Sequence, residues 1–385
     1  AGMSIAVYDT DNNRIDHVWS RNDQGQASFT QYHYNAEGQL LFTVTGATRS
    51  EVTGLTGITV DNVMSLSASD VESLLGAGMN IAVYDIDHNR IDHTWSRSEN
   101  GAVSFTRYTY DTAGSLVYTV RGATRDAVEN LTGLTIENVA TLTESEISSI
   151  LSSDMALTVY DSESDRVDHI WSVSEGGEIT FTTYHYDTLG KLVYTVTGDS
   201  RNEVEGITGI NSENAANLTE DEIRSLLLPG MSLSVYDTVN NRVDHVWALD
   251  ETGKVSFTQY NYDDLGKLVF TVTGSVRAEV ENLPGITVYN AAVLTESEID
   301  LFLSAGMSVA VYDTVNSRVD HVWSRDASGQ ASFTKYFYDN AGNLSYTVAG
   351  ANRAEVENVT GITPDSVGSL TQTQIDSLLG AGMSI

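Results

Sequence analysis

The sequence contains no cysteine and only 3 prolines among its 385 residues. The absence of cysteine excludes a disulfide framework and thiolate-ligated metal sites. Basic residues are also scarce, because 20 Lys and Arg stand against 53 Asp and Glu, which gives a formal net charge of −33. This charge argues against nucleic-acid backbones and anionic membranes as partners. No apolar run reaches the roughly 18 residues that a membrane helix needs, so we do not expect membrane insertion.

The sequence is built on an internal repeat with a period of 76 residues. The string Ala-Gly-Met-Ser-Ile opens at residue 1, close variants start at 77, 153, 229 and 305, and the original string returns at 381. A fixed period without insertions identifies a tandem array. We therefore predict five units, at 1–76, 77–152, 153–228, 229–304 and 305–380. Residues 381–385 are the start of a sixth repeat.

The first half of each copy has the composition of β-strands. In the first copy, residues 4–8, 14–20, 27–34 and 39–45 are rich in aromatic and β-branched residues, and polar turn segments separate them. Two hairpins in succession predict a four-stranded antiparallel β-meander. In the third strand, Thr30, Tyr32 and Tyr34 are identical in all five copies, whereas positions 31 and 33 differ. We expect the constant face to be packed and the variable face to be solvated, because alternate residues face opposite sides of a strand.

The second half of each copy has the signals of short helices. Ser67 precedes Asp70 by three residues, and the other copies have Thr followed three residues later by Glu or Gln, a capping box in four of the five copies. Gly76 and Gly78 stand where this helix should end. The fold class is thus an α+β tandem repeat, in which each meander is followed by two or three short helices. Linkers of only two or three residues predict rigid, contacting neighbours.

The third and fourth strands carry a recurring motif that begins Tyr32-His-Tyr34-Asn35 and continues through Gly38 to Leu40. In the other copies it becomes Tyr-x-Tyr-Asp-x-x-Gly-x-Leu, starting at Tyr108, Tyr184, Tyr260 and Tyr336. This motif resembles the YD (RHS) repeat of large bacterial surface and secreted proteins. The resemblance is limited to these two strands of each repeat. It implies that Asp-x-x-Gly is a hairpin turn, that the tyrosines pack between hairpins, and that the chain is a bacterial, extracellular or cell-surface scaffold.

A second motif, Asp16-His17-x-Trp19, recurs in every copy and has the residue types of an acid–base pair. Adjacent residues of a regular strand point to opposite faces, so we expect Asp16 and His17 not to bond to each other. We predict instead that Ile15, His17 and Trp19 share a packed face and that Asp16 pairs with Arg14 on the other. No Ser or Cys nucleophile motif accompanies the pair, so the sequence predicts no catalytic residues and no enzyme.

The first turn of the repeat offers oxygen ligands at alternate positions, the spacing that opens a calcium loop. The middle acid becomes Val239 and Val315 in the last two copies, and no copy supplies the Gly and distal Glu of an EF-hand. Asp and Asn also favour plain turns, because they bond their own backbone. We therefore favour polar turns and predict no cofactor, with calcium as the alternative. The weak calcium candidates are Asp9, Asp11, Asn13, Asp85, Asp87, Asn89, Asp161, Glu163 and Asp165.

These observations favour a structural extracellular repeat protein that forms a rigid fibre, stalk or adhesin shaft, with head-to-tail strand pairing between repeats or molecules. Self-association with identical repeats or molecules is the expected interaction. One alternative is a multivalent surface module that binds a glycan or calcium through five weak sites. Another is a fragment of a secreted shell of the YD/RHS type.

Overall fold

The computed structural model describes residues 3–22, 25–340, 342–380 and 382–385. The chain folds as two compact units, Ala1–Tyr184 with Gly198–Glu205 and His185–Thr197 with Gly206–Ile385. Groups of four strands followed by short helices repeat about every 76 residues, which confirms the predicted α+β tandem repeat. None of the helices in the described residues has the length and apolar character needed to cross a membrane.

The first unit contains eleven described strands and seven described helical segments. The strands are β1 (Met3–Asp9), β2 (Arg14–Arg21), β3 (Ala27–Tyr34), β4 (Leu40–Gly46), β5 (Asn80–Asp85), β6 (Arg90–Arg97), β7 (Val103–Tyr110), β8 (Leu116–Gly122), β9 (Ala156–Asp161), β10 (Arg166–Val173) and β11 (Ile179–Tyr186), the last up to Tyr184. The helices are α1 (Arg49–Thr53), η1 (Val63–Ser65), α2 (Ala68–Leu74), α3 (Arg125–Glu129), η2 (Val139–Thr141), α4 (Glu144–Ile150) and α5 (Arg201–Glu205), where η marks a 3₁₀ turn.

The second unit has the same alternation of meanders and helices. Its strands are β12 (Leu192–Gly198), β13 (Ser232–Asp237), β14 (Arg242–Leu249), β15 (Val255–Tyr262), β16 (Leu268–Gly274), β17 (Ser308–Asp313), β18 (Arg318–Arg325), β19 (Ala331–Tyr338) and β20 (Leu344–Gly350). Its helices are η3 (Ala215–Asn217), α6 (Glu220–Leu226), α7 (Arg277–Glu281), η4 (Ala291–Val293), α8 (Glu296–Phe302), α9 (Arg353–Glu357), α10 (Pro364–Val367) and α11 (Gln372–Leu378).

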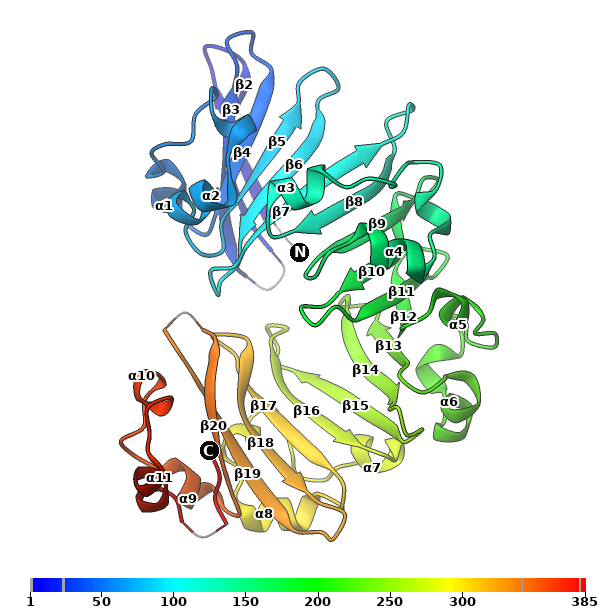
Figure 1. The fold of residues 1–385 in the computed structure, drawn as a ribbon, viewed down its shortest axis with the longest axis vertical. Coiled ribbons are helices and arrows are strands. Elements are labelled where there is room, and N and C mark those ends of the chain that lie inside the picture. The colour runs from blue at the N-terminus through cyan, green and yellow to red at the C-terminus, as the bar shows by residue number, and fades with distance from the viewer. Residues whose placement is uncertain (1–2, 23–24, 341, 381) are drawn as a thin grey trace. The chain divides into compact units, whose positions relative to one another are not determined.

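Strands pair antiparallel with their neighbours in the chain, from β1 to β11 in the first unit and from β12 to β20 in the second. Figure 1 shows this order as a continuous change of colour across the strands of each unit. The first strand of a copy pairs on one side with its own second strand and on the other with the fourth strand of the preceding copy. Ile81 in β5, for example, lies opposite Trp95 in β6 and opposite Val44 in β4.

The core of each copy forms on the face that the helices cover. Trp95 and Phe105 are both 0% exposed, and their rings meet edge to face with centroids 4.8 Å apart. The guanidinium of Arg125, the first residue of α3, lies 5.5 Å from the centre of the Phe105 ring. The edge-to-face geometry and the cation over the ring both match the charge distribution of an aromatic ring. The same tryptophan and phenylalanine are buried in the third, fourth and fifth copies.

The last helix of each copy starts as the sequence predicts. Thr143 accepts a hydrogen bond from the backbone N–H of Glu146, whose carboxylate in turn accepts one from the backbone N–H of Thr143. Ser67 and Asp70 form the same reciprocal pair, so the shorter acid completes the capping box in the first copy as well. Thr219 and Thr371 form the same pair, so four copies satisfy two otherwise unpaired backbone donors at this helix start.

A buried methionine packs across the boundary between sequence copies. The side chain of Met79, which belongs to the second copy, is 2% exposed and lies over Gly46 and Val52 of the first. A Cβ at Gly46 would stand 3.1 Å from Val52 Cγ2 and 3.3 Å from Met79 Cγ, so a larger residue would push both side chains outward. At the end of the chain, Met383 lies against Gly350 in the same way. The described part of 381–385 therefore completes the fifth repeat.

We predict that Met307→Ala destabilises the fourth repeat, although residue 307 belongs to the fifth sequence copy. Met307 is 2% exposed and lies against Gly274. Loss of a buried methionine side chain costs about 2–5 kcal/mol when the cavity does not collapse. Hydrogen exchange should therefore accelerate in β16 and α7 as well as in β17. Met64→Ala is the matched control, because Met64 is 45% exposed. Unchanged exchange in β16 and α7 would contradict packing across the boundary.

Candidate functional site

The Asp-His-x-Trp motif lies on the second strand of each copy, where the ladder is irregular. Val7 lies opposite His17 and Tyr8 lies opposite Ile15, so Asp16 is an extra residue without a partner in the ladder. This is a β-bulge, in which two residues of one strand oppose one residue of the other. The same shift occurs against His93, His169, His245 and His321.

The bulge brings the Asp and His side chains together, contrary to the sequence-based prediction. His17 Nδ1 lies 2.6 Å from Asp16 Oδ2, and the corresponding distances are 2.6–2.7 Å in the other four copies. Strict alternation of side chains fails at a bulge, because the extra residue turns its neighbour back to the same side. The prediction that Ile15 shares the face of His17 and Trp19 is wrong for the same reason. Ile15 is paired with Tyr8, whereas His17 is paired with Val7, and Tyr8 and Val7 point to opposite faces of the first strand.

The variable positions of the third strand also differ from expectation, because they share the face that carries the core. Gln31 lies opposite His17 and Phe29 lies opposite Trp19, so residues 29, 31 and 33 are on the helix-covered side. Gln31 Nε2 donates to Asp16 Oδ1 over 3.2 Å. The equivalent residues of the second, fourth and fifth copies, Arg107, Gln259 and Lys335, also donate a hydrogen bond to the aspartate of the bulge. The identity of the residue therefore varies while its hydrogen-bonding role is kept.

The constant tyrosines lie on the opposite face of the sheet and are half-buried. Tyr34 donates its hydroxyl to the carbonyl of Ile15, and Arg14 places its guanidinium 4.4 Å from the centre of the Tyr34 ring. Tyr110, Tyr262 and Tyr338 form equivalent bonds to the strand before them. These four hydroxyl bonds hold the end of the third strand beside the bulged second strand.

The histidines of the motif are buried against the aromatic core. They are between 0% and 7% exposed, whereas general acid–base catalysis requires the imidazole to reach the reacting group. His245 contacts Phe257, with ring centroids 5.0 Å apart, and the tryptophan of the motif packs on the same phenylalanine. Among the described residues, His245 Nε2 and Trp247 Nε1 are buried without a hydrogen-bond partner, as are their equivalents in the second, third and fifth copies.

The electrostatics of the pair favour an ionised aspartate. The hydrogen bond with His245 lowers the pKa of Asp244 below its usual value, although partial burial opposes the shift. His321 lowers the pKa of Asp320 in the same way, with a further contribution from Lys335. Because Nδ1 of the histidine faces a carboxylate oxygen, that nitrogen is the donor and carries the proton.

The calcium candidates lie in the turn between the first and second strands. The backbone N–H of Asp11 donates to Asp9 Oδ1 over 3.0 Å, and Asn13 has a left-handed backbone with φ of 49°. The hydrogen bond from Asn12 is the largest cause that lowers the pKa of Asp9. The turns at 85–89 and 161–165 are alike: Asp87 and Glu163 donate to Asp85 and Asp161, and Asn89 and Asp165 have positive φ.

The same turn forms where the middle acid is missing. The backbone N–H of Val239 donates to Asp237 Oδ1 over 2.9 Å, and Val315 donates to Asp313 over the same distance. The first aspartate therefore serves the turn in every copy, whether or not an acid follows. In the described chain, groups of three or more acids and histidines that could hold a metal ion are absent. Calcium binding by the nine candidate residues stays a prediction.

The junction between copies consists of the paired fourth and first strands, the buried methionine and two arginines. Arg97 in β6 donates to the carbonyls of Glu72 and Leu75 at the end of α2, over 2.9 and 2.7 Å. Backbone carbonyls at a helix end lack intrahelical partners, and a cation there is also favoured by the helix dipole. Arg325 caps α8 in the same way.

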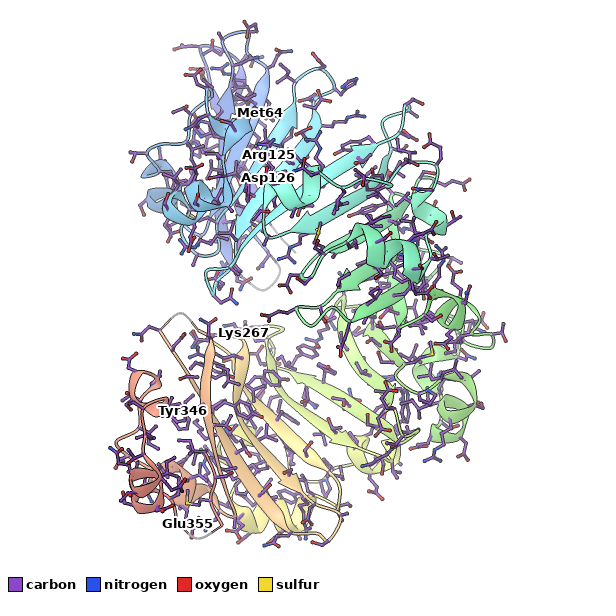
Figure 2. The ribbon with its side chains drawn as sticks, in the orientation of Figure 1. Met64, Arg125, Asp126, Lys267, Tyr346 and Glu355 are labelled. Carbon is purple, nitrogen blue, oxygen red and sulfur yellow. The ribbon has the colours of Figure 1, made fainter. Side chains whose placement is uncertain are left out.

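The second arginine of the junction starts the first helix of the next copy. Arg125 donates to the carbonyl of Met64 in the 3₁₀ turn of the preceding copy, and Figure 2 shows the two residues close together in the first unit. Arg277 forms the same bond to Ala216 over 2.8 Å, and Arg353 forms it to Ala292. Sequence reasoning missed both arginines as functional residues. Their recurrence in an acidic chain with only 20 basic residues is the signal that could have found them.

No family model matches the sequence, and no curated protein matches it. Among solved structures, two crystal structures of TcdB2-TccC3 are similar, with TM-scores of 0.24 and 0.23 at 12% and 13% identity. They match 91% and 93% of this chain, which spans only 15% and 18% of theirs. A porin-like protein from Bacteroides uniformis has a TM-score of 0.20 at 9% identity, covering 90% of this chain and 88% of its own.

We predict that Asp244→Ala destabilises the fourth repeat by about 1–3 kcal/mol, because it leaves a donor of a buried imidazole unpaired. His245 is 0% exposed, so Nδ1 has little access to water as a replacement partner. Chemical denaturation combined with hydrogen exchange in β14 measures the effect. Glu251→Ala, in an exposed turn of the same copy, is the control. Equal stability of the two variants would show that the Asp–His bond contributes nothing to the fold.

We also predict a loss of stability in acid. A carboxylate whose pKa is lower in the folded state stabilises the fold above its unfolded pKa, about 3.9 for Asp, and this contribution is lost as the pH falls through the folded value. The contribution of these aspartates to the melting temperature should be complete above about pH 5 and should be lost below about pH 4. Asp244→Asn should make the fall shallower, because Asp244 no longer takes up a proton. An unchanged slope would contradict this assignment.

Proposed function

We propose that the chain is a structural scaffold, a rigid array of fibre, stalk or adhesin-shaft type at a bacterial cell surface or outside the cell. The observation that supports it best is the junction, where the sheet passes from copy to copy without a free linker. β4 pairs with β5 over four residues, from Phe42 opposite Val83 to Thr45 opposite Asn80. Pairing of this kind fixes the position of each copy relative to the next within a unit.

Further contacts at the ends of the strands support stiffness. Lys267 donates its ammonium to the carbonyl of Thr314 over 2.9 Å, which links the third hairpin turn of one copy to the first turn of the next (Figure 2 labels Lys267). Lys191 forms the same bond to Thr238 over 2.7 Å, and Gln39 forms it to Ile86. The junctions after the first, third and fourth copies are thus held along the strands, in the helical layer and at the turns. Repeat arrays derive their stability from such interfaces between neighbours.

The other hypotheses draw on fewer features. A secreted shell fragment of the YD/RHS type rests on the Tyr-x-Tyr-Asp-x-x-Gly motif, which forms the third and fourth strands as that resemblance implies. A glycan- or calcium-binding module rests on the half-buried tyrosine face and the acidic turns. The absence of catalytic residues remains our expectation for the whole chain. The junctions involve more of each copy than either alternative site, and we therefore give priority to the scaffold.

Distances between spin labels within each unit test the proposal. The chain has no cysteine, so pairs of introduced cysteines are labelled selectively. Ala36→Cys with Thr112→Cys in the first unit, and Asp264→Cys with Asn340→Cys in the second, occupy equivalent exposed turn positions one repeat apart. A rigid junction predicts one narrow distribution for each pair, centred near four strand spacings, about 20 Å. Broad distributions would indicate copies that swing on linkers and would overturn the scaffold.

A further inference from the structure

Two turns that meet at the junction between the third and fourth copies each expose an apolar side chain. Leu189, in the turn before β12, is 80% exposed, and Val239, in the turn after β13, is 83% exposed. The two turns are neighbours, because β12 pairs with β13 and the ammonium of Lys191 donates to the carbonyl of Thr238. The third and fourth copies thus contribute one residue each to an apolar pair at the ends of the strands.

The junction between the fourth and fifth copies repeats this arrangement. Leu265 and Val315 are 62% and 82% exposed, and their turns are joined by the bond from Lys267 to the carbonyl of Thr314. Figure 2 labels Lys267 at this end of the strands. The second pair lies four strand spacings from the first, about 20 Å, and both pairs belong to the second unit. The two leucines and two valines are called the apolar row below.

The first and second junctions have other residues at the same positions. Glu37 and Asp87 occupy them at the first junction, and Ala113 and Glu163 occupy them at the second. The turns are neighbours there too, since β4 pairs with β5 and β8 pairs with β9. A leucine on one side of a junction is therefore always accompanied by a valine on the other, and a residue other than leucine is accompanied by an acid.

This coordination follows the junction and not the sequence copy. The third copy has Leu189 in its third turn but Glu163 in its first turn. The fifth copy has Val315 in its first turn but Ala341 in its third. Duplication of a whole copy would carry both of its turns together, so duplication does not account for the pairs. The two residues of a pair, which come from different copies, therefore serve one surface.

The turns do not need the apolar side chains that they carry. The backbone N–H of Val239 donates to Asp237 over 2.9 Å, and that of Asp11 donates to Asp9 over 3.0 Å, so the turn is the same with either residue. Side chains that are between 62% and 83% exposed also contribute little burial to the fold. Single exposed apolar residues are ordinary, whereas a group of them marks an interaction surface.

The local charge indicates which partner the apolar row accepts. Two copies of a chain with a net charge of −33 repel each other over most of their surfaces. Beside the apolar row, however, Lys191 and Lys267 stand where the first two junctions have Gln39 and Ser115. Valines also replace the acids of those junctions. The second unit therefore presents less negative charge at these turns than the first, and a second copy meets less repulsion there.

We propose that the apolar row binds the apolar row of a second copy of this chain, so that two arrays associate side by side. The two rows have the same spacing, and a twofold axis brings both pairs of one copy onto both pairs of the other. Any other partner would have to carry apolar groups at that same spacing. The inference rests on the proposed scaffold, because only a fixed distance between junctions lets the two pairs bind together.

Restoring the acids of the first two copies tests the contact. Val239→Asp with Val315→Asp gives the fourth and fifth copies the residue that Asp11 and Asp87 provide in the first and second, so the turns stay folded. The double variant should lower the association constant of the full chain by about 10- to 100-fold, because it places charges in an apolar contact. Analytical ultracentrifugation measures this constant.

The matched control adds the same two charges elsewhere. Ala36→Asp with Ala113→Asp changes exposed turn residues of the first unit. At about 0.15 M salt, charges away from the contact are largely screened, so this variant should change the association constant by less than about twofold. Equal association constants for the two double variants would reject the apolar row as the surface.

Thiol reactivity locates the contact without adding charge. Leu265→Cys introduces the single cysteine of the chain within the apolar row, and Ala113→Cys introduces it at the equivalent position of the second copy. The rate at which Leu265→Cys reacts with a maleimide should fall as the protein concentration rises, because a second copy covers the thiol. The rate for Ala113→Cys should stay constant over the same concentrations.

The outcomes separate this inference from the scaffold on which it rests. A chain that stays monomeric up to about millimolar concentration rejects the side-by-side contact. A slow reaction of Leu265→Cys that does not depend on concentration rejects the second copy as the partner, because the chain then covers its own row. None of these results affects the label distances within each unit, which test the junctions inside one molecule.

Discussion

The pairing of the fourth strand of one copy with the first strand of the next is the constraint on which each unit depends. It places Met79 over Gly46, because the methionine enters the strand that lies beside the glycine. It also brings Arg97 to the end of α2. The first copy, removed from its successor, would lose a strand, a buried side chain and a helix cap together. A unit of 76 residues is near the size at which one core is only marginally stable, so the neighbour contributes what the copy lacks.

The sequence predicted the elements well because their signals are local. The period of 76, the alternation of strand residues and the pairs such as Thr143 and Glu146 each depend on residues close in the chain. The bulge at Asp16 was not predictable in the same way, because it is defined by the offset between two strands. Strict alternation then gave the wrong neighbours for His17. The face of Gln31 was misjudged for a related reason, since variation in identity was equated with exposure to solvent.

The β-bulge at Asp16 explains why Asp, His and Trp recur together in the motif. An extra residue leaves Asp16 outside the ladder, where it accepts hydrogen bonds from His17 and from the third strand. The histidine is thereby fixed against Phe29, and Trp19 packs on the same ring. Asp, His and Trp recur together because each positions the next. The recurrence of this pair thus accompanies the recurrence of the aromatic packing that it positions.

The junction arginine shows how the array tolerates change. The position of Arg97 and Arg325 is occupied by Val173 in the third copy and Leu249 in the fourth, and these are 7% and 5% exposed. Two copies therefore satisfy helix carbonyls with a guanidinium, and two bury an apolar side chain at the same place. The arginine contributes hydrogen bonds and an interaction with the helix dipole that salt weakens, whereas the apolar residue contributes burial that salt does not weaken. Junctions of the two kinds should therefore respond differently to ionic strength, although the strand pairing beside them is the same.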